Sequence, residues 1–289
     1  MRLLSFLYED IPHIGAESTR GIVDFRAAAP ELPDSMLALL AAGPAAMDVA
    51  RHACERSVRS GVGLIAEPRI RRLAPLPRPG KILAIGFNYR SHAEETGTSI
   101  PAAPLIFSKA ASAVIGPGAA IEIPLVSACI DYEGELGVII GTRARRVLRG
   151  QALNYIAGYT IINDVSARDY QSRSGHCIAK SFDTFAPMGP VLVTADEIPD
   201  PGKLELRTVV SGEQLQHATT DDLIFDVPTL IEYISAGVTL EPGDVISTGT
   251  PGGVGFRRTP PRFLRPGDVV RIEISSIGVL ENPVVKAQP

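Results

Sequence analysis

The sequence has no tryptophan and only three cysteines among its 289 residues. Cys54, Cys129 and Cys177 are too far apart for a zinc-binding pattern, and their odd number does not indicate a disulfide framework. We therefore interpret them as ordinary reduced thiols. Neither a cluster of thiolate metal ligands nor a small disulfide-stapled fold is expected.

Long apolar runs and long runs of like charge are also missing. No uninterrupted apolar stretch reaches the roughly 18 residues of a membrane-spanning helix. The first segment meets Glu9 and Asp10 before the apolar part of a secretory signal could be completed. The 28 basic and 32 acidic residues give a net charge of -4, with only short arginine clusters. We therefore expect a cytoplasmic protein that binds neither membranes nor nucleic acids.

What is present indicates a small first domain followed by a large one. Residues 1–75 contain two strand-like segments, "MRLLSFLY" and "RGIVDF", and the helix-favouring "SMLALLAAGPAAMDVARHACERS", which is broken near Gly43–Pro44. These patterns predict a small N-terminal α/β cap domain. The proline-rich "LAPLPRPGK" that follows is typical of a semi-rigid linker.

Residues 76–289 are predicted to form a mostly β domain. Short β-branched runs alternate with glycine and proline, and the turn "PGDV" precedes two of them, at 242–245 and 266–269. Two patches, "SARDYQSRSG" and "VPTLIEYISAG", favour helix. So many strands with so few helices predict an α+β fold that is mostly β, rather than a βαβ repeat. The strand-like runs are "KILAIGFNY", "PLIFSKA", "IEIP", "ELGVIIG", "YIAGYTIIND", "GPVLVTA", "LELRTVVSG", "DVISTG" and "DVVRIEISSIGVLENPVV".

The stretch "DYEGELGVIIG" places two carboxylates, Glu133 and Glu135, on one face of a predicted strand. They can lie on a half-exposed strand whose acidic side is solvated. Alternatively, a divalent cation removes their repulsion, which requires a further oxygen donor from elsewhere in the fold. Asp164, at the end of the apolar run "TIIND", can supply that donor, although taken alone it is better explained as a helix cap.

A second pattern, H-x-x-E, occurs in "SHAEETG". His92 and Glu95 share one face of a short predicted helix, so the carboxylate can orient the imidazole and raise its basicity. This spacing also suits a surface salt bridge. Ser91 and Glu94 can in turn form a capping box.

Six segments together resemble the fumarylacetoacetate hydrolase family, in its order and spacing over roughly residues 78–285. The resemblance implies a β-roll of mixed sheets in the catalytic domain (76–289), a smaller N-terminal domain (1–75) and a homodimer. The tail "FRRTPPRFLRPGDVV" resembles a subgroup with sugar-acid diketo hydrolases and the mammalian domain-containing relatives. The six segments are "IGFNYRSHAEETG", "PLIFSKAASAVIGP", "DYEGELGVIIG", "AGYTIINDVSARDYQ", "AKSFDTFAPMGP" and "GDVISTGTPGGVGF".

The resemblance implies that Glu133, Glu135 and Asp164 are ligands of Mg²⁺ or Mn²⁺. It also implies that His92 and Glu95 form a general base on a lid that orders over substrate. The founding hydrolase has a fourth acidic ligand near its catalytic histidine, but "AIGFNY" contains no acid here. This departure predicts an ion with three protein ligands and leaves the founding enzyme's substrate in doubt.

Four other residues match functional positions of the family. Lys180 matches a lysine near the metal, and Thr250 matches a loop threonine that hydrogen-bonds substrate. Arg168 and Gln171 are expected to contact substrate, on the assumption that they lie on one helix face with Asp164. Asp131 has no ligand counterpart in the family and is interpreted as a surface acid or an acid behind the ligands. The glycines of "STGTPGGVG" match neither a P-loop nor a dinucleotide-binding pattern.

These residues predict a metal-dependent hydrolase that cleaves a carbon–carbon bond in an acylpyruvate-like or 2,4-diketo acid. The ion would stabilise an enolate, and His92 with Glu95 would activate water. The alternatives are decarboxylation of an oxaloacetate-like 2-oxo acid and keto–enol isomerisation on the same site. A catalytically idle member of the family is less expected, because every matched site residue is present.

Overall fold

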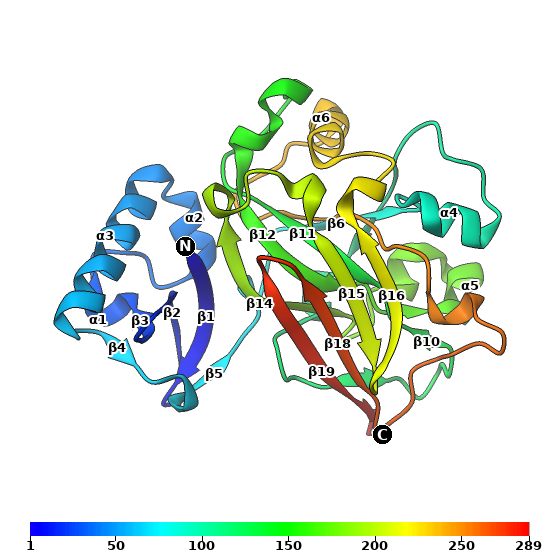
Figure 1. The fold of residues 1–289 in the computed structure, drawn as a ribbon, viewed down its shortest axis with the longest axis horizontal. Coiled ribbons are helices and arrows are strands. Elements are labelled where there is room, and N and C mark those ends of the chain that lie inside the picture. Colours follow the sequence, from blue (N-terminus) through cyan, green and yellow to red (C-terminus); the bar gives the residue numbers. More distant parts are fainter. Residues whose placement is uncertain (289) are drawn as a thin grey trace.

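The computed structural model describes residues 1–288. It is built on two large β-sheets and one short two-stranded pair (Figure 1). The twelve strands of the larger sheet are β1 (Arg2–Tyr8), β2 (Ile11–Ser18), β3 (Gly21–Asp24), β4 (Leu64–Ile65), β5 (Ile70–Arg72), β6 (Ile82–Gly86), β7 (Leu105–Lys109), β8 (Val114–Ile115), β11 (Gly134–Ile140), β12 (Ile156–Asn163), β14 (Ala186–Thr194) and β17 (Val245–Ser247). Its main path runs β4-β3-β2-β1-β14-β12-β11-β17-β6-β7, with β5 on β1 and β8 on β14.

The second sheet has the order β16-β15-β18-β19-β9. It packs on the larger sheet through contacts of β15 with β11, β18 with β12 and β19 with β14. Its strands are β9 (Ile121–Ile123), β15 (Glu205–Val210), β16 (Glu213–Thr219), β18 (Val269–Ile274) and β19 (Gly278–Lys286), and the short pair is β10 (Ile130–Asp131) with β13 (Ser166–Ala167). The predicted mostly β, α+β fold is therefore confirmed.

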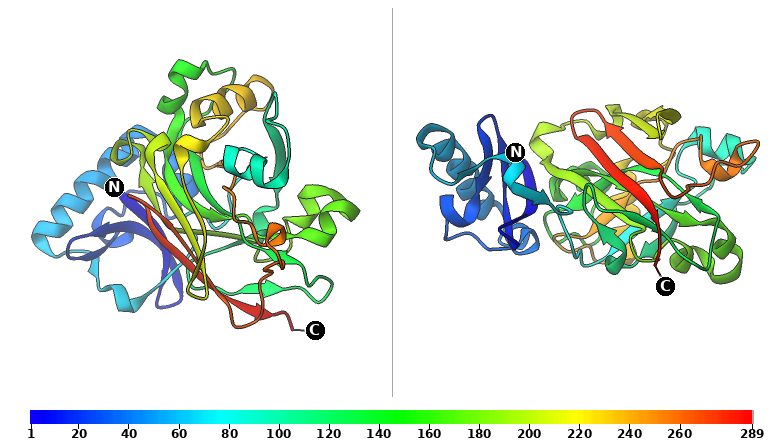
Figure 2. Two further views of the ribbon diagram at one scale, coloured as in Figure 1. Left: turned by 45° about the vertical axis from the view of Figure 1, so that its right-hand side comes forward. Right: turned by 90° about the horizontal axis from the view of Figure 1, so that it is seen from below.

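The helices lie on the outside of the sheets, and helices of the N-terminal part pack against β2 and β3 (Figure 2). The α-helices are α1 (Phe25–Ala28), α2 (Met36–Ala41), α3 (Pro44–Ser60), α4 (Arg90–Thr96), α5 (Arg168–Ala179) and α6 (Val227–Gly237). The 3₁₀ helices are η1 (Glu67–Arg69), η2 (Ala111–Ala113), η3 (Arg149–Tyr155), η4 (Ala195–Glu197), η5 (Pro201–Lys203), η6 (Thr220–Asp222) and η7 (Gly255–Arg257). Among the described residues, no helix combines the length and apolar character needed to cross a membrane.

The N-terminal part and the rest of the chain share one sheet. Strand β1 pairs antiparallel with β14, with Leu3 opposite Leu192. Residues 73–81 contain no helix or strand, as the linker prediction requires, but Ala74 and Leu76 are buried, and Ser5 Oγ donates a hydrogen bond to the Pro75 carbonyl. The division into domains at residues 75 and 76 stays a prediction.

Two local predictions are confirmed, but several short strands were missed, of which β2 and β16 are the longest. Both "PGDV" turns lead into strands, and Gly243 and Gly267 have φ angles of 84° and 93°, which glycine adopts without strain. Strand β2 was not predicted because "IPHIGAES" lacks a β-branched run. It forms because its residues pair with β1 from Ala16 to Ile11.

Strand β11 is buried along its whole length, because β12 and β17 flank it and the second sheet covers it. The neighbouring pair β12–β14 is packed so closely that a Cβ on Gly158 would lie 2.0 Å from the Val193 carbonyl oxygen. A side chain at Gly158 would therefore force apart the strands that position the site.

We expect Gly158→Ala to lower the free energy of unfolding by more than about 2 kcal/mol, because the methyl group meets backbone that cannot move aside. Gly150→Ala is the matched control, since a Cβ there meets no atom within 4 Å, and its effect should stay within about 0.5 kcal/mol. Urea unfolding followed by circular dichroism measures both. Equal stabilities of the two variants would contradict the packing described for β12 and β14.

Candidate functional site: a buried acidic triad beneath a histidine helix

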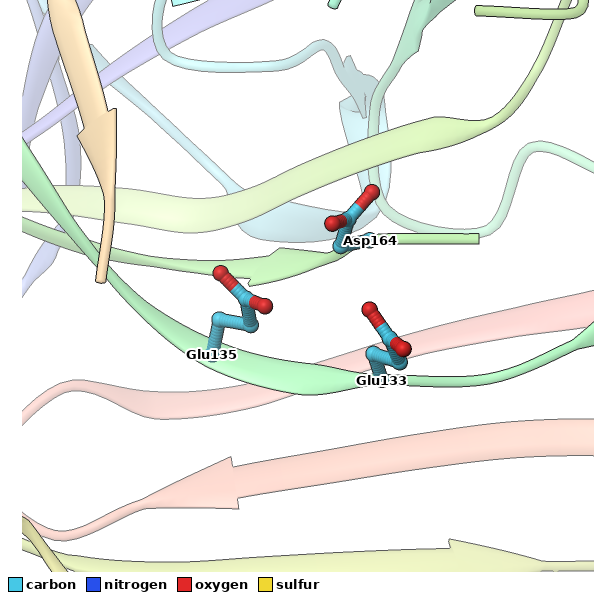
Figure 3. Close-up of side chains that lie close together, drawn as sticks. All are labelled: Glu133, Glu135 and Asp164. Carbon is cyan, nitrogen blue, oxygen red and sulfur yellow. The ribbon is translucent and has the colours of Figure 1, made fainter. Parts of the chain in front are cut away.

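Three carboxylates meet where β11 begins and β12 ends. Because the two strands are antiparallel with Gly134 opposite Asn163, Glu133 and Glu135 lie beside Asp164, the residue that follows β12. Figure 3 shows both glutamates on the same side of their strand, pointing toward Asp164. One oxygen from each carboxylate lies within 4.8 Å of the others, and all three residues are buried. The alternative of a half-exposed strand with a solvated acidic side is therefore wrong.

Two lysines neutralise part of this charge. Lys180 Nζ donates to Glu133 Oε2 at 2.5 Å and to Asp164 Oδ2 at 2.6 Å. Lys109 Nζ donates to Asp164 Oδ1 at 2.5 Å and is fully buried. Burial would lower the pKa of Lys180, but the carboxylates of Asp164 and Glu133 outweigh burial and raise that pKa. Lys180 is thus a charged ammonium beside the triad, as the family resemblance implied.

Arg168 is held between two acids at the start of α5. Its Nε donates to Asp131 Oδ2 at 2.8 Å, and its Nη2 donates to Glu133 Oε1 at 2.6 Å. Burial would raise the pKa of Glu133, but Lys180 and Arg168 outweigh it and hold the pKa below its usual range. Asp131 is fully buried, so it is not a surface acid but lies behind the ligand positions.

Among the residues that the structure describes, no cation hydrogen-bonds to Glu135, the third member of the triad. Ser247 Oγ donates to its Oε2 at 2.5 Å, and the Gly249 N–H donates to the same oxygen at 3.0 Å. Burial, together with the neighbouring charges of Asp164 and Glu133, raises the pKa of Glu135 to about 8. A carboxylate in this position favours a further positive charge nearby.

The charge balance of the cluster fits a divalent ion. The four acids, Asp131 included, face three cations, so the net charge is -1 when all are ionised. Three buried carboxylates offering oxygens to one point form the donor set that Mg²⁺ and Mn²⁺ prefer. Glu133, Glu135 and Asp164 would hold such an ion. The cluster would then carry a net charge of +1, which suits an anionic substrate.

The helix α4 contributes a histidine to the lining of the same pocket. His92 is buried, its ring stacks on Phe87, and its Nδ1 lies 3.4 Å from Glu95 Oε2. Burial would raise the pKa of Glu95, but hydrogen bonds from His92 and the Gly253 N–H outweigh it and lower that pKa. The structure therefore brings His92 and Glu95 together, and within residues 1–288 no group hydrogen-bonds to Nε2 of His92.

The loop after β17 holds α4 in place. The Gly253 N–H donates to Glu95 Oε1 at 2.9 Å, and Arg257 donates to the Thr96 carbonyl. Gly253 has a φ of 100°, and a Cβ there would lie 2.0 Å from the Leu215 carbonyl oxygen, so this position requires glycine. Ser91 does not cap α4: the N-cap is Tyr89, and the Ser91 N–H donates to Asp222. The capping-box alternative is therefore wrong.

Asp164 does not lie on α5, contrary to the helical spacing that we assumed. It precedes β13, and the N-cap of α5 is Ala167, so Asp164 is not a helix cap either. Gln171 and Arg168 nevertheless line the same pocket as Asp164, because α5 begins beside the triad. The empty space of the pocket, open solvent included, is about 440 Å³, but the centres of water molecules can occupy only about 60 Å³ of it, so the pocket is small.

Thr250 also lines this pocket. Its hydroxyl donates to the Gly134 carbonyl at 3.0 Å and accepts a hydrogen bond from Gln216 Nε2 at 2.8 Å. These bonds fix the side chain next to Glu133 and Glu135. Gln216 was not predicted, since β16 carries no pattern that marks a site.

Sequence reasoning also missed Lys109 and Ser247, which contact the triad directly. Lys109 ends the apolar strand "LIFSK", and a lysine at the buried end of a strand is a signal that could have identified it. Ser247 carried no such signal, because a serine at a strand end is common.

Binding of a divalent ion should release protons at neutral pH. At pH 7 the Glu135 carboxyl, with a pKa of about 8, is mostly protonated, and a ligand carboxylate must lose its proton. We expect release of about one proton per Mn²⁺ at pH 7 and almost none at pH 9.5, so apparent affinity rises with pH up to about 8. Calorimetry in buffers of different ionisation enthalpy measures this release.

The control is Glu135→Gln, which should bind Mn²⁺ more weakly and release no proton at pH 7. Proton release that is the same at pH 7 and pH 9.5 would show that Glu135 is not the titrating ligand.

Curated proteins of similar sequence span nearly the whole chain. The mitochondrial oxaloacetate tautomerase Fahd2a of Rattus norvegicus is 41% identical over 291 residues, which covers 99% of this chain and 92% of that protein. The name of that relative places it in mitochondria. The expectation of a cytoplasmic protein is therefore contradicted. That expectation considered only a membrane-spanning helix and a secretory signal, and neither of these bears on transport to mitochondria.

Solved structures and a family model agree with this similarity. A fumarylacetoacetate hydrolase from Exiguobacterium antarcticum is 36% identical with a TM-score of 0.86, covering 99% of this chain and all of that one. Maleylpyruvate hydrolase from Sphingobium, in complex with manganese(II) and pyruvate, is 31% identical with a TM-score of 0.83 and full coverage of both chains. The model for the C-terminal domain of fumarylacetoacetate hydrolase matches residues 81–285. The chain therefore belongs to the fumarylacetoacetate hydrolase family of enzymes.

Proposed function

We propose that this enzyme interconverts the keto and enol forms of a short 2-oxo dicarboxylic acid such as oxaloacetate, with Mg²⁺ or Mn²⁺ bound by Glu133, Glu135 and Asp164. The observation that carries the proposal is one small pocket in which a histidine–glutamate pair faces a buried carboxylate triad. The relative named an oxaloacetate tautomerase, which aligns over 99% of this chain, supports the choice of reaction.

The reaction moves one proton from carbon to oxygen. In the keto-to-enol direction, C3 of the substrate loses a proton and the C2 oxygen gains one, so no water, oxidant or second substrate is consumed. When bound, the ion supplies Lewis-acid stabilisation of negative charge on the C2 oxygen. Proton transfer then requires a base within hydrogen-bond reach of C3, and the proton that this base takes up is delivered to the C2 oxygen directly or through solvent, which restores the base.

His92 is the proposed base. Its Nδ1 is directed to Glu95, so Nε2 can take the C3 proton and return it in the reverse direction. The imidazolium that forms is stabilised by the Glu95 carboxylate, which the Gly253 N–H fixes in place. The His92 imidazole on α4 thus holds the transferred proton, while the substrate binds at the triad.

The remaining predicted residues bind and orient the substrate. The charged ammonium of Lys180, beside Glu133 and Asp164, is the proposed partner for an anionic oxygen of the 2-oxo acid. Gln171 and Thr250 line the pocket and offer polar groups to the same molecule. Arg168 supports the site mainly through Glu133 and Asp131, which take two of its nitrogens.

Hydrolysis of an acylpyruvate-like acid, which the sequence placed first, is the second candidate. The structure of maleylpyruvate hydrolase with manganese(II) and pyruvate, similar over the full chain, favours it. Hydrolysis needs the same base to activate water and needs a second carbonyl in the substrate. Tautomerisation needs neither an activated water nor a second carbonyl. It also agrees with the oxaloacetate tautomerase, which is 41% identical, whereas the maleylpyruvate hydrolase is 31% identical. Decarboxylation of oxaloacetate is a third candidate reaction for this site.

For the assembly, we expect a homodimer.

The test dilutes enol oxaloacetate into buffer and follows the decay of its ultraviolet absorbance, with and without enzyme loaded with Mg²⁺ or Mn²⁺. Buffer with the ion alone is the baseline. Pyruvate and carbon dioxide report decarboxylation, and a panel of acylpyruvates reports hydrolysis. We expect acceleration of the enol decay. Cleavage of an acylpyruvate without that acceleration would replace tautomerisation by hydrolysis.

Loss of His92 should lower tautomerisation by roughly two to four orders of magnitude, the usual contribution of general base catalysis. Mn²⁺ affinity of His92→Ala should hardly change, because the imidazole is not a proposed ligand. His217→Ala is the matched control, since His217 also pairs with a glutamate, Glu205, but lies exposed on β16. A wild-type rate in His92→Ala would show that the base lies elsewhere.

A further inference from the structure

One wall of the pocket carries a residue that the proposed function does not use. Helix α5 runs from the triad along one side and is interrupted at Gly175, whose φ of 76° and ψ of 173° are not helical. The residue after this kink, His176, lines the same pocket as His92 and the triad. A titratable ring is therefore placed at the pocket away from the lid helix.

Packing fixes the His176 ring without engaging its nitrogens. The imidazole lies against Phe107, with ring centroids 5.4 Å apart and a tilt of 32°. Lys180 Nζ contacts the same phenyl ring, 5.1 Å from its centroid. Within residues 1–288, no side chain or carbonyl hydrogen-bonds to an imidazole nitrogen of His176. The Phe107 ring thus positions both the ammonium beside the triad and the imidazole farther out.

Most of the other polar side chains of the pocket already make hydrogen bonds to the protein. Arg168 donates to Asp131 and Glu133, and Lys180 donates to Glu133 and Asp164. Thr250 donates to the Gly134 carbonyl. Among the pocket-lining residues of α5, Gln171 and His176 are the two whose side chains make no hydrogen bond within residues 1–288. Both line the same pocket as the triad and Lys180, so they can offer donors to a second polar end of a small substrate.

Burial, followed by the nearby Lys180 charge, lowers the pKa of His176. A neutral imidazole still carries one N–H donor. It can therefore donate to an anionic oxygen without adding a further cation beside Lys180.

We propose that His176 is a specificity residue that binds the distal carboxylate of a dicarboxylic 2-oxo acid and so selects it over a monocarboxylic one. This inference rests on the proposed function, because it assigns the two ends of that substrate. The 2-oxo end lies at the triad and Lys180, and the distal carboxylate accepts a hydrogen bond from the His176 ring. His176 does not touch the reacting atoms and is not a catalytic residue.

Binding of two unreactive 2-hydroxy acids tests this assignment without catalysis. Malate carries the distal carboxylate and lactate lacks it, so the ratio of their dissociation constants measures its recognition. In the Mn²⁺-loaded protein we expect malate to bind at least tenfold more tightly than lactate. In His176→Phe, which keeps the ring against Phe107 but removes the donor, malate affinity should fall about ten- to a hundredfold and lactate affinity should not change.

Two variants separate recognition from structure. His176→Gln restores an N–H donor and should recover most of the malate preference. Cys177→Ser changes the neighbouring residue, which does not line the pocket, and should keep the wild-type ratio. With oxaloacetate, His176→Phe should raise KM by a similar factor and leave kcat within about threefold.

A wild-type protein that binds malate no more tightly than lactate would overturn the inference, as would a His176→Phe variant with an unchanged ratio. An equal loss of affinity for both acids would also overturn it, since that pattern indicates damage to the whole site. Failure of the proposed function gives a different result. If the enzyme does not accelerate the decay of enol oxaloacetate but still binds malate more tightly than lactate, tautomerisation is wrong and the assignment of His176 stands.

Discussion

Burial of like charge is the constraint on which the site depends. The triad consists of three buried residues whose carboxylate oxygens lie within 4.8 Å of one another: Glu133, Glu135 and Asp164. Moving one ionised carboxylate from water into the protein interior costs roughly several kcal/mol. Lys180 and Lys109 compensate part of this cost through short contacts with Glu133 and Asp164. The third acid, Glu135, accepts hydrogen bonds from Ser247 and the Gly249 N–H, and its pKa is raised. A divalent ion bound to the cluster would stabilise its ionised form.

The fold supplies this arrangement through strand register rather than through a loop. Antiparallel pairing of β11 and β12 sets Gly134 against Asn163, so the acids at the two strand ends must meet. The second sheet then covers them, and α4 and α5 form the walls of the pocket. A site held by paired strands keeps its geometry, and contacts of Gly253 with Glu95 and of Arg257 with Thr96 hold the helix that carries His92 beside it.

Much of this could be predicted from the sequence. Alternation along a strand placed Glu133 and Glu135 on one face, and the spacing of His92 and Glu95 predicted a shared helix face; both are confirmed. Long-range contacts could not be predicted. Lys109 reaches Asp164 from a strand 55 residues away, and the β2 strand exists only through its pairing with β1. Asp164 was placed on a helix because residue spacing cannot show that a short strand intervenes.

The central claim is that the three acids form one divalent-ion site. A crystal soaked with Mn²⁺ and measured at the manganese absorption edge tests it most directly, because anomalous scattering locates the ion independently of any activity. The account predicts one strong peak at coordination distance from oxygens of Glu133, Glu135 and Asp164, with the Lys180 ammonium shifted away from at least one of them. A triad that still binds only the two lysines, with manganese absent or bound elsewhere, would contradict it.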